Sequence, residues 1–183
     1  MSDLSFSLRP ELPEDLAAVD ALHAEAFGPG RFARTAFRLR EGVPHDPRLS
    51  FSALIDGTLV GSVWLTPMRI GNTPALLLGP LTVSPLVKHK GIGRALMKRA
   101  MEEATAAGHA LVLLVGDEPY YGPFGFKMVP PGSIEMPGPV DPRRLLIAEL
   151  VPGAAQNAKG PARKALGPET FEEIEEVGLR AMS

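Results

Sequence analysis

The residues best suited to chemistry lie between Leu81 and Arg94, where an apolar run passes into a basic, glycine-punctuated segment and then into a helical pattern. Glycine lets the backbone approach a ligand closely, and the first turn of a helix presents unpaired N–H groups at the positive end of its dipole. Such a turn suits an anion, best of all a pyrophosphate. A helix start with solvated lysines is the alternative interpretation. Residues 84–101 contain no acidic residue and five basic ones: Lys88, Lys90, Arg94, Lys98 and Arg99.

The spacing excludes two common phosphate loops. A P-loop has Lys and then Ser or Thr directly after its last glycine, whereas Arg94 and Ala95 follow Gly93. The dinucleotide fingerprint needs a third glycine, which the residues after Gly93 do not supply, and it opens on a strand–helix unit rather than on a run of strands.

The elements that position this segment follow from the hydrophobic period. Three alternating stretches with short connections precede it and predict an antiparallel meander. Asp56-Gly57 suits the type I′ turn of a tight hairpin. Pro80 cannot donate to a strand ladder, so Gly79-Pro80 predicts a bulge or a point where two strands part, the alternative being a strand that ends and restarts. The predicted strands are Ser50–Ile55, Thr58–Leu65 and Ala75–Val83.

A helix and another strand follow the basic segment. A helical pattern runs from about Gly91 to Ala107, and Ala110–Val115 is a continuous apolar run, typical of a strand buried on both faces and parallel to its neighbour. The third meander strand, this helix and this strand therefore form a βαβ-like unit. The predicted inner face of the helix holds Ile92, Leu96, Ala100 and Ala104.

The two ends of the chain supply the remaining elements. They predict strands at Phe6–Arg9 and Leu145–Val151, and helices at Leu16–Phe27, Phe32–Arg40 and about Pro168–Ala181. The second helix would carry Arg31, Arg34 and Arg38 on one face. Such a face suits contact with an acidic substrate or simply with solvent. We expect a catalytic domain over residues 1–153, with a loop and amphipathic helix over residues 154–183 packed on it. That last helix could instead dock on a second subunit, which makes a homodimer possible.

The composition of the chain excludes several classes of protein and partner. The chain has 183 residues, 45% hydrophobic and 22% charged, which is ordinary for one folded domain. A formal charge of −2 offers no general field for nucleic acid, which is not expected as a partner. The chain has no cysteine, and its four histidines show no paired ligand spacing, so no metal is expected. No apolar stretch approaches the roughly 20 residues of a membrane helix, and no secretory signal is visible, so a cytoplasmic protein is expected.

The basic segment, Lys88-His89-Lys90-Gly91-Ile92-Gly93, resembles the Gln/Arg-x-x-Gly-x-Gly/Ala acyl-CoA loop of the GCN5-related N-acetyltransferases. Downstream, Tyr120-Tyr121-Gly122-Pro123-Phe124-Gly125-Phe126 is similar to the family's Tyr-x-x-x-Gly-Phe signature. With Val115-Gly116-Asp117 and Glu149-Leu150-Val151-Pro152-Gly153, the chain resembles the YhbS-like predicted acetyltransferases of that family. The resemblance covers about residues 6–153. It implies a mixed α/β fold, an antiparallel meander continuing into a parallel strand pair splayed at a bulge, with helices on both faces.

The resemblance also implies an activity, the transfer of an acetyl group from acetyl-CoA to a primary amine by direct attack in a ternary complex. The amine would belong to a small molecule or to a protein. The CoA pyrophosphate would bind the main chain of the loop, and the pantetheine arm would bind the freed strand edge. Lys88 departs from the family's Gln or Arg: it keeps a cation but loses the planar fork of arginine. The implied CoA-binding residues are Leu81, Thr82, Val83, Lys88, His89, Lys90, Gly91, Ile92, Gly93 and Arg94.

Tyr121, four residues before Gly125, matches the family's general acid, which protonates the leaving thiolate. A buried structural tyrosine is the alternative, and Tyr120 is expected to pack. The family's frequent acidic base has no counterpart, because Leu77, Leu78 and Gly79 occupy its place on the strand.

Several groups are candidates for the base that takes a proton from the acceptor amine. Asp117 is the nearest by position, with a helix cap as its alternative role. Glu25 and His45 lie where members of the family that the chain resembles place acceptor-binding segments, although a solvated surface role is the alternative for both; water is a further candidate for the base. The missing strand carboxylate motivates a second hypothesis, a non-catalytic acyl-CoA binding or sensing module. Tyr121 favours the enzyme, because a sensor needs no acid for a thiolate.

Overall fold

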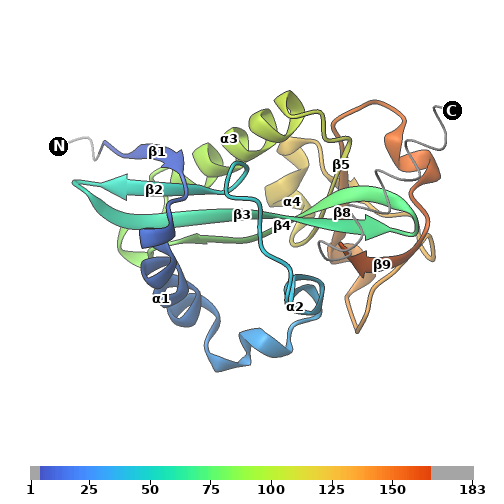
Figure 1. Ribbon diagram of the computed structural model, residues 1–183, viewed down its shortest axis with the longest axis horizontal. Helices are drawn as coiled ribbons and strands as arrows, with labels where there is room; N and C mark the ends of the chain where they lie inside the picture. The colour runs from blue at the N-terminus through green and yellow to red at the C-terminus, as the bar shows by residue number, and fades with distance from the viewer. Residues whose placement is uncertain (1–4, 166–183) are drawn as a thin grey trace, which may run out of the picture.

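The computed structural model describes residues 5–165 and shows a mixed sheet with helices on both faces (Figure 1). The strand order is β1-β2-β3-β4-β5-β8-β6, and β9 pairs with both β3 and β7. The strands are β1 Ser7–Pro10, β2 Phe51–Ile55, β3 Thr58–Ile70, β4 Thr73–Val83, β5 Leu111–Val115, β6 Lys127–Met128, β7 Ile134–Glu135, β8 Leu145–Glu149 and β9 Gly160–Lys164. The helices are α1 Leu16–Phe27, α2 Thr35–Arg40, α3 Ile92–Ala106 and α4 Glu118–Tyr121, joined by short 3₁₀ turns.

The predicted meander is confirmed. Strands β2, β3 and β4 pair antiparallel in sequence order. Asp56 and Gly57 have φ values of 49° and 76°, the positive values that a type I′ turn requires at both central residues. Strand β3 continues past the predicted Leu65 to Ile70, through Pro67. Pro67 lies between the segment of β3 that pairs with β2 and the segment that pairs with β9, so on that edge its missing N–H breaks no ladder.

The predicted bulge and the parallel pair are also confirmed. Leu65 pairs with Leu78 and Val63 pairs with Leu81, so Trp64 alone lies opposite Gly79 and Pro80. Strand β5 runs parallel to β4, but the two pair only at Leu76–Val112 and Leu77–Leu113. The strands therefore part just before the bulge, and from there to Val83 no strand within residues 5–165 pairs with β4 on that side.

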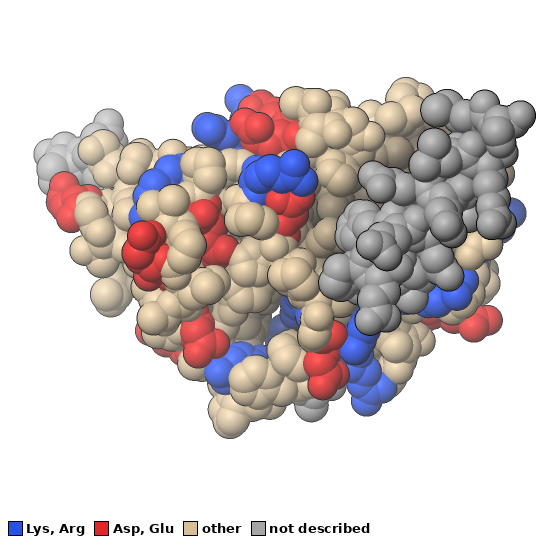
Figure 2. All heavy atoms as spheres, in the orientation of Figure 1, with Lys and Arg blue, Asp and Glu red and all other residues tan. Residues whose placement is uncertain are grey.

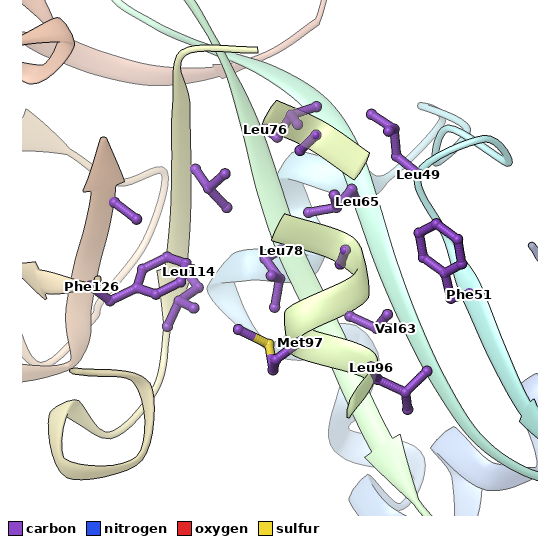
Figure 3. Packing of buried hydrophobic residues seen from close by; sticks show 14 of the residues in the cluster. Leu49, Phe51, Val63, Leu65, Leu76, Leu78, Leu96, Met97, Leu114 and Phe126 are labelled. Atoms are coloured by element: carbon purple, nitrogen blue, oxygen red, sulfur yellow. The ribbon is translucent and has the colours of Figure 1, made fainter. Parts of the chain in front are cut away.

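The sheet buries two apolar clusters, one on each face. On one face, α3 packs with Ile92, Leu96, Ala100 and Ala104 inward, each at most 1% exposed, as their spacing predicts. Figure 3 shows Leu96 and Met97 from this helix in one cluster with Val63, Leu65 and Leu78 of the sheet. The other face carries the second cluster, which includes Leu39 of α2 and Leu77 of β4, and α1 contacts β3 and β4. In Figure 1, α3 lies above the sheet, and α1 and α2 lie below it.

An internal ion pair fixes the start of α1. Arg9 Nη2 donates to Asp15 Oδ1 at 2.9 Å, and the backbone N–H of Leu12 and the hydroxyl of Ser52 donate to the other oxygen. The Arg9 contact, aided by these hydrogen bonds, lowers the pKa of Asp15 to about 2 against the cost of its burial. The three- and four-residue spacing of Leu16, Val19, Leu22, Ala26 and Phe27 predicts one buried face for α1. This prediction is partly wrong, because Leu16 is 45% exposed while His23 is buried beside Val19 and Leu22.

Two local predictions differ from the structure. The helix predicted over Phe32–Arg40 breaks at Arg34, whose backbone is extended, into a 3₁₀ turn and α2. A distant contact sets the start of α2, since the Thr35 hydroxyl donates to Pro139 O at 2.7 Å. Residues 160–164, predicted as loop, form β9 against the end of β3.

The predicted helix over Pro168–Ala181 lies outside the described residues. Among the helices of residues 5–165, none combines the length and apolar character needed to cross a membrane.

Candidate active site

The basic segment forms a loop at the start of α3. His89 and Gly91 adopt positive φ values of 67° and 82°. The first hydrogen bond within the helix is donated by Ala95 to Gly91 O at 3.0 Å, and no described side chain caps the helix start. The N–H groups of residues 92–94 are therefore left without intrahelical partners, at the positive end of the helix dipole.

A cavity of about 700 Å³ opens beside this loop, and most of the predicted CoA-binding residues meet there. Lys90 is exposed and does not line the cavity, and Thr82 has a buried side chain next to Ser62 in the ladder. Thr82 can therefore serve this cavity only through its main chain. The lining residues are Leu81, Val83, Val87, Lys88, His89, Gly91, Ile92, Gly93, Arg94, Tyr120 and Tyr121.

One wall of the cavity is the free edge of β4. Leu81, Thr82 and Val83 pair with β3 on one side, whereas the pairing with β5 stops at Leu77. Their outward N–H and C=O groups pair with no other described strand, and an extended ligand with amide groups can add one strand to this edge. The structure thus brings the helix-start amides and the strand edge to one cavity, as the sequence predicts.

Tyr121 lies where this cavity meets a second one. Its ring packs against Gly116, where an added Cβ would approach the ring at 2.3 Å. A glycine at residue 116 therefore leaves the room that the ring needs in this position. Burial, with a smaller contribution from Tyr120, raises the pKa of Tyr121 to about 12, so the hydroxyl remains protonated. Tyr120 is half-exposed, and its hydroxyl lies 2.8 Å from the point where a Cβ on Gly93 would stand. Tyr120 packs edge-on against Tyr121, as expected for a packing residue, and it also forms part of the cavity wall.

The second cavity, of about 770 Å³, lies on the α1 and α2 side of the splayed strands. Leu81, Tyr120 and Tyr121 line both cavities, so a ligand in one can reach a ligand in the other at these residues. Figure 2 shows the surface hollowed at the lower centre, in the region between α1 and α2 of Figure 1, with Lys or Arg side chains visible inside. The charged lining residues include Asp20, Arg31, Arg34, Arg40, Asp117 and Arg144.

The guanidinium of Arg40 lies beside Gly79, one of the strand positions where the acidic base of the resembled family has no counterpart. Its Nη1 lies 3.4 Å from the point where a Cβ on Gly79 would stand, so the missing side chain of Gly79 leaves room for the guanidinium. Burial, together with repulsion from Arg34, lowers the pKa of Arg40 to about 10, and the group therefore stays charged at neutral pH.

A Glu–His pair, which sequence reasoning missed, lies in the same cavity. Glu11 is buried, accepts a hydrogen bond from Trp64 Nε1 at 2.7 Å and pairs with His45 Nε2. The ring of His45 stacks on Trp64, with centroids 4.1 Å apart and planes at 8°. His45 and Trp64 line the cavity, whereas Glu11 does not, and its contact with Nε2 holds the imidazole from the side away from the cavity lining. The sequence signal was weak, because Glu11 and His45 are 34 residues apart.

The other sequence candidates lie in less enclosed places. Asp117 lines the cavity, but its side chain is 74% exposed and pairs with Arg144, Nε to Oδ1 at 3.1 Å. Its side chain makes no cap hydrogen bond to α4, although its carbonyl accepts from Tyr120 and Tyr121 N–H. Glu25 is exposed on α1, away from the cavity. The expected common face of Arg31, Arg34 and Arg38 is broken at Arg34: two of them line the cavity, while Arg38 donates to Pro137 O.

These features together define a class of protein. A strand edge freed by a splayed parallel pair, free amides at a basic helix start and a second cavity that meets the first at a protonated tyrosine are the parts of an acyl-CoA-dependent acyltransferase. Residues 16–126 match the family model described as "Acetyltransferase (GNAT) family". The chain belongs to this family.

Relatives agree with this assignment. The chain is 27% identical over 126 residues to the protein of Escherichia coli K12 called "Uncharacterized N-acetyltransferase YhbS", a match that covers 66% of this chain and 73% of that protein. The crystal structure of E. coli YhbS in complex with CoA has the same fold, with a TM-score of 0.75 and 24% identity over 92% of this chain and 93% of that one. A GNAT family acetyltransferase from Brucella melitensis, solved with acetyl-CoA, matches with a TM-score of 0.57 and 27% identity over 78% of this chain and 95% of that one.

Proposed function

We propose that this protein transfers the acetyl group of acetyl-CoA to a primary amine by direct attack in a ternary complex. The observation that supports this most is the junction of the two cavities at Leu81, Tyr120 and Tyr121. A thioester held along the β4 edge would place its carbonyl at that junction, within reach of an amine in the second cavity. Similarity to proteins solved with CoA and with acetyl-CoA supports the donor. We keep the cytoplasm as its location, because a chain without cysteine suits a reducing compartment.

The reaction moves two protons. The neutral amine nitrogen attacks the thioester carbon, a C–N bond forms, and the C–S bond breaks to release the CoA thiolate. We assign the proton that the thiolate receives to the hydroxyl of Tyr121, and the main chain of the β4 edge and the α3 start to CoA binding. The proton that the amine loses passes to a base in the second cavity, either directly or through water.

His45 is our first candidate for that base, ahead of Asp117. A general base works best when a partner fixes its orientation, and Glu11 holds Nε2 of His45 while Trp64 holds the ring plane. Asp117 is exposed and already paired with an arginine. Water remains the base if neither side chain serves.

Replacing His45 with alanine should lower kcat by about 10²-fold, the lower range for a positioned general base. Added imidazole should then restore part of the rate in a concentration-dependent way, because it can occupy the vacated space and accept the proton. Asp117→Asn is the matched comparison and should change kcat less than His45→Ala does. A full rate for His45→Ala, or a loss that imidazole does not repair, would give the role to Asp117 if Asp117→Asn is inactive, and full rates for both variants would leave it to water.

The experiment that tests the function itself combines isothermal titration of the protein with CoA and a thiol-release assay over a broad amine panel. Binding with turnover of any primary amine supports the enzyme. Tight acetyl-CoA binding without turnover of any amine supports the second candidate, the acyl-CoA sensing module, which the missing strand carboxylate motivates.

A further inference from the structure

The acceptor cavity holds an arginine whose charge no described residue balances, and this feature points to the chemical class of the acceptor. We propose that the acceptor is a small amino carboxylate and that Arg40, with Thr66 and His23, binds its carboxylate group. The inference deepens the proposed acetyl transfer and rests on it, since it concerns the substrate of the same site. Nothing in it depends on which group takes the proton from the amine.

The guanidinium of Arg40 is largely buried and makes no hydrogen bond or ion pair with any residue between 5 and 165, although the backbone carbonyl of Arg40 accepts from Val43 N–H at 3.0 Å. Removing a guanidinium from water is costly unless an anion or hydrogen-bond acceptors replace the water. Arg34, the charged group that acts on Arg40, is another cation, and it lies over the ring of Phe27 at 4.7 Å. A carboxylate that enters the cavity would offset this charge.

The described acidic residues of the cavity cannot do so, because each already has an arginine. Asp117 pairs with Arg144, and Asp141 pairs with Arg143. Asp20 lies at the exposed rim, 3.9 Å from Arg31. Arg40 lies deeper, against Gly79 at the bulge, where the strands part.

Two more polar atoms in the cavity lack partners. His23 Nε2 and Thr66 Oγ1 are buried without a hydrogen bond to any described group. Thr66 pairs in the ladder with Leu77, two residues before Gly79, so its strand position is close to that of the Arg40 contact. Burial and the charge of Arg40 lower the pKa of His23 to about 4, so its ring is neutral and Nε2 donates in one of its two tautomers.

The three groups therefore offer donors to one anionic group, and a carboxylate has the acceptor positions to use them. A cationic amine would be repelled from the same place. The acceptor is thus oriented with its carboxylate toward Arg40 and its amine toward Leu81 and Tyr121, where the two cavities meet. Arg40 Nη1 lies 3.4 Å from the point where a Cβ on Gly79 would stand, and Gly79 is only two residues before Leu81, so one small molecule can present its carboxylate to Arg40 and its amine to the junction.

The test uses the full chain with acetyl-CoA and a panel of α- and ω-amino acids, each beside its carboxamide and its decarboxylated amine. We expect kcat/KM for the best amino acid to exceed that of its carboxamide by about 10- to 100-fold, the usual value of a hydrogen bond to a charged group. Arg40→Gln should remove this preference by lowering kcat/KM for the amino acid far more than for its carboxamide, while Arg40→Lys should keep part of it. Arg38→Gln, on the same helix but outside the cavity, is the control for loss of one charge and should keep the preference.

Trp64 supplies a reading that does not depend on turnover, because it is the single tryptophan of the chain and it lines this cavity. Titration of the CoA-bound protein with the same amino acids should change its fluorescence, and Arg40→Gln should weaken that binding by about 10- to 100-fold. If Arg40→Gln does not fold, Thr66→Val, which removes only the hydroxyl donor at similar size, should weaken amino acids selectively.

The possible results separate the two proposals. Equal use of amino acids and carboxamides by the parent protein, or equal losses for both in Arg40→Gln, overturns the carboxylate site and leaves acetyl transfer intact. Turnover of no amine at all, with amino acid binding that depends on Arg40, overturns the transferase and supports the site. Absence of both turnover and amino acid binding overturns both.

Discussion

Replacing Tyr121 with phenylalanine is expected to lower kcat by about 10²–10⁴-fold, the usual contribution of a positioned general acid. The change removes one oxygen and keeps the ring, which packs against Gly116, so the fold and the affinity for CoA should hardly change. The loss should fall on kcat rather than on KM, because the hydroxyl is needed only as the thiolate forms. Thiol-release kinetics and titration with CoA measure the two effects separately.

The pKa of Tyr121, about 12, bears on this role in two ways. It keeps the proton on the phenol throughout the neutral and moderately alkaline range, so kcat should show no alkaline loss there from tyrosine ionisation. It also makes the phenol a weak acid beside an ordinary thiol of pKa about 8.5. A thiolate formed at the same buried junction is destabilised by the same desolvation, which brings the two groups closer in proton affinity. Transfer is therefore expected in concert with C–S cleavage.

Tyr120→Phe is the matched variant, since Tyr120 borders the same two cavities and its ring meets that of Tyr121 edge-on at 4.8 Å. Its hydroxyl lies at the start of α3, so its removal should alter CoA affinity more than kcat. If the large kcat loss appears in Tyr120→Phe and not in Tyr121→Phe, the acid is Tyr120. Full kcat in both variants would assign the proton to water.

The parts of the fold that the sequence predicted correctly are those set by local chemistry. Asp56-Gly57 determines its turn through backbone preference, the α3 face follows from helical period, and Pro80 marks the bulge because it cannot donate to a ladder. The parts it missed depend on distant partners. Strand β9 has a sequence, Gly-Pro-Ala-Arg-Lys, with little strand preference. It is extended because it pairs with the end of β3, more than 90 residues earlier in the chain. Gly71 permits this approach, since a Cβ there would meet Lys159 O at 2.3 Å.

The same difference between local and distant determinants explains which part of the site could be predicted from the sequence. The CoA side lies on one continuous segment, from β4 through the loop into α3, so a motif could reveal it. The acceptor side is assembled from Glu11, His45 and Trp64, with Arg40 on a fourth segment, and their relation exists only once α1 and α2 lie under the sheet. Arg40 in particular has the periodicity of an ordinary helix residue. That its guanidinium meets no acidic partner among residues 5–165 is a property of the tertiary structure alone.

Gly91→Asp is expected to abolish CoA binding, as measured by isothermal titration. Gly91 stands directly before α3 with φ 82°, and a Cβ added there would meet nothing within 4 Å, so no clash forbids the substitution. What it adds is a carboxylate at the point where the free amides of residues 92–94 would face the pyrophosphate. Repulsion between like charges, in place of the attraction at a helix start, reverses the sign of the local interaction.

Gly91→Asn separates charge from shape, because Asn matches Asp in size and the two residues share a tolerance for positive φ. It should weaken CoA binding modestly, and the difference between the two variants measures the charge effect. Lys88→Ala should do less than Gly91→Asp, about 1 kcal/mol, because the exposed Lys88 makes a solvent-screened contact. Undiminished CoA affinity in Gly91→Asp would remove this loop from the binding site. Equal losses in Asp and Asn variants would instead show that the backbone of residue 91, rather than the electrostatics of the helix start, limits CoA binding.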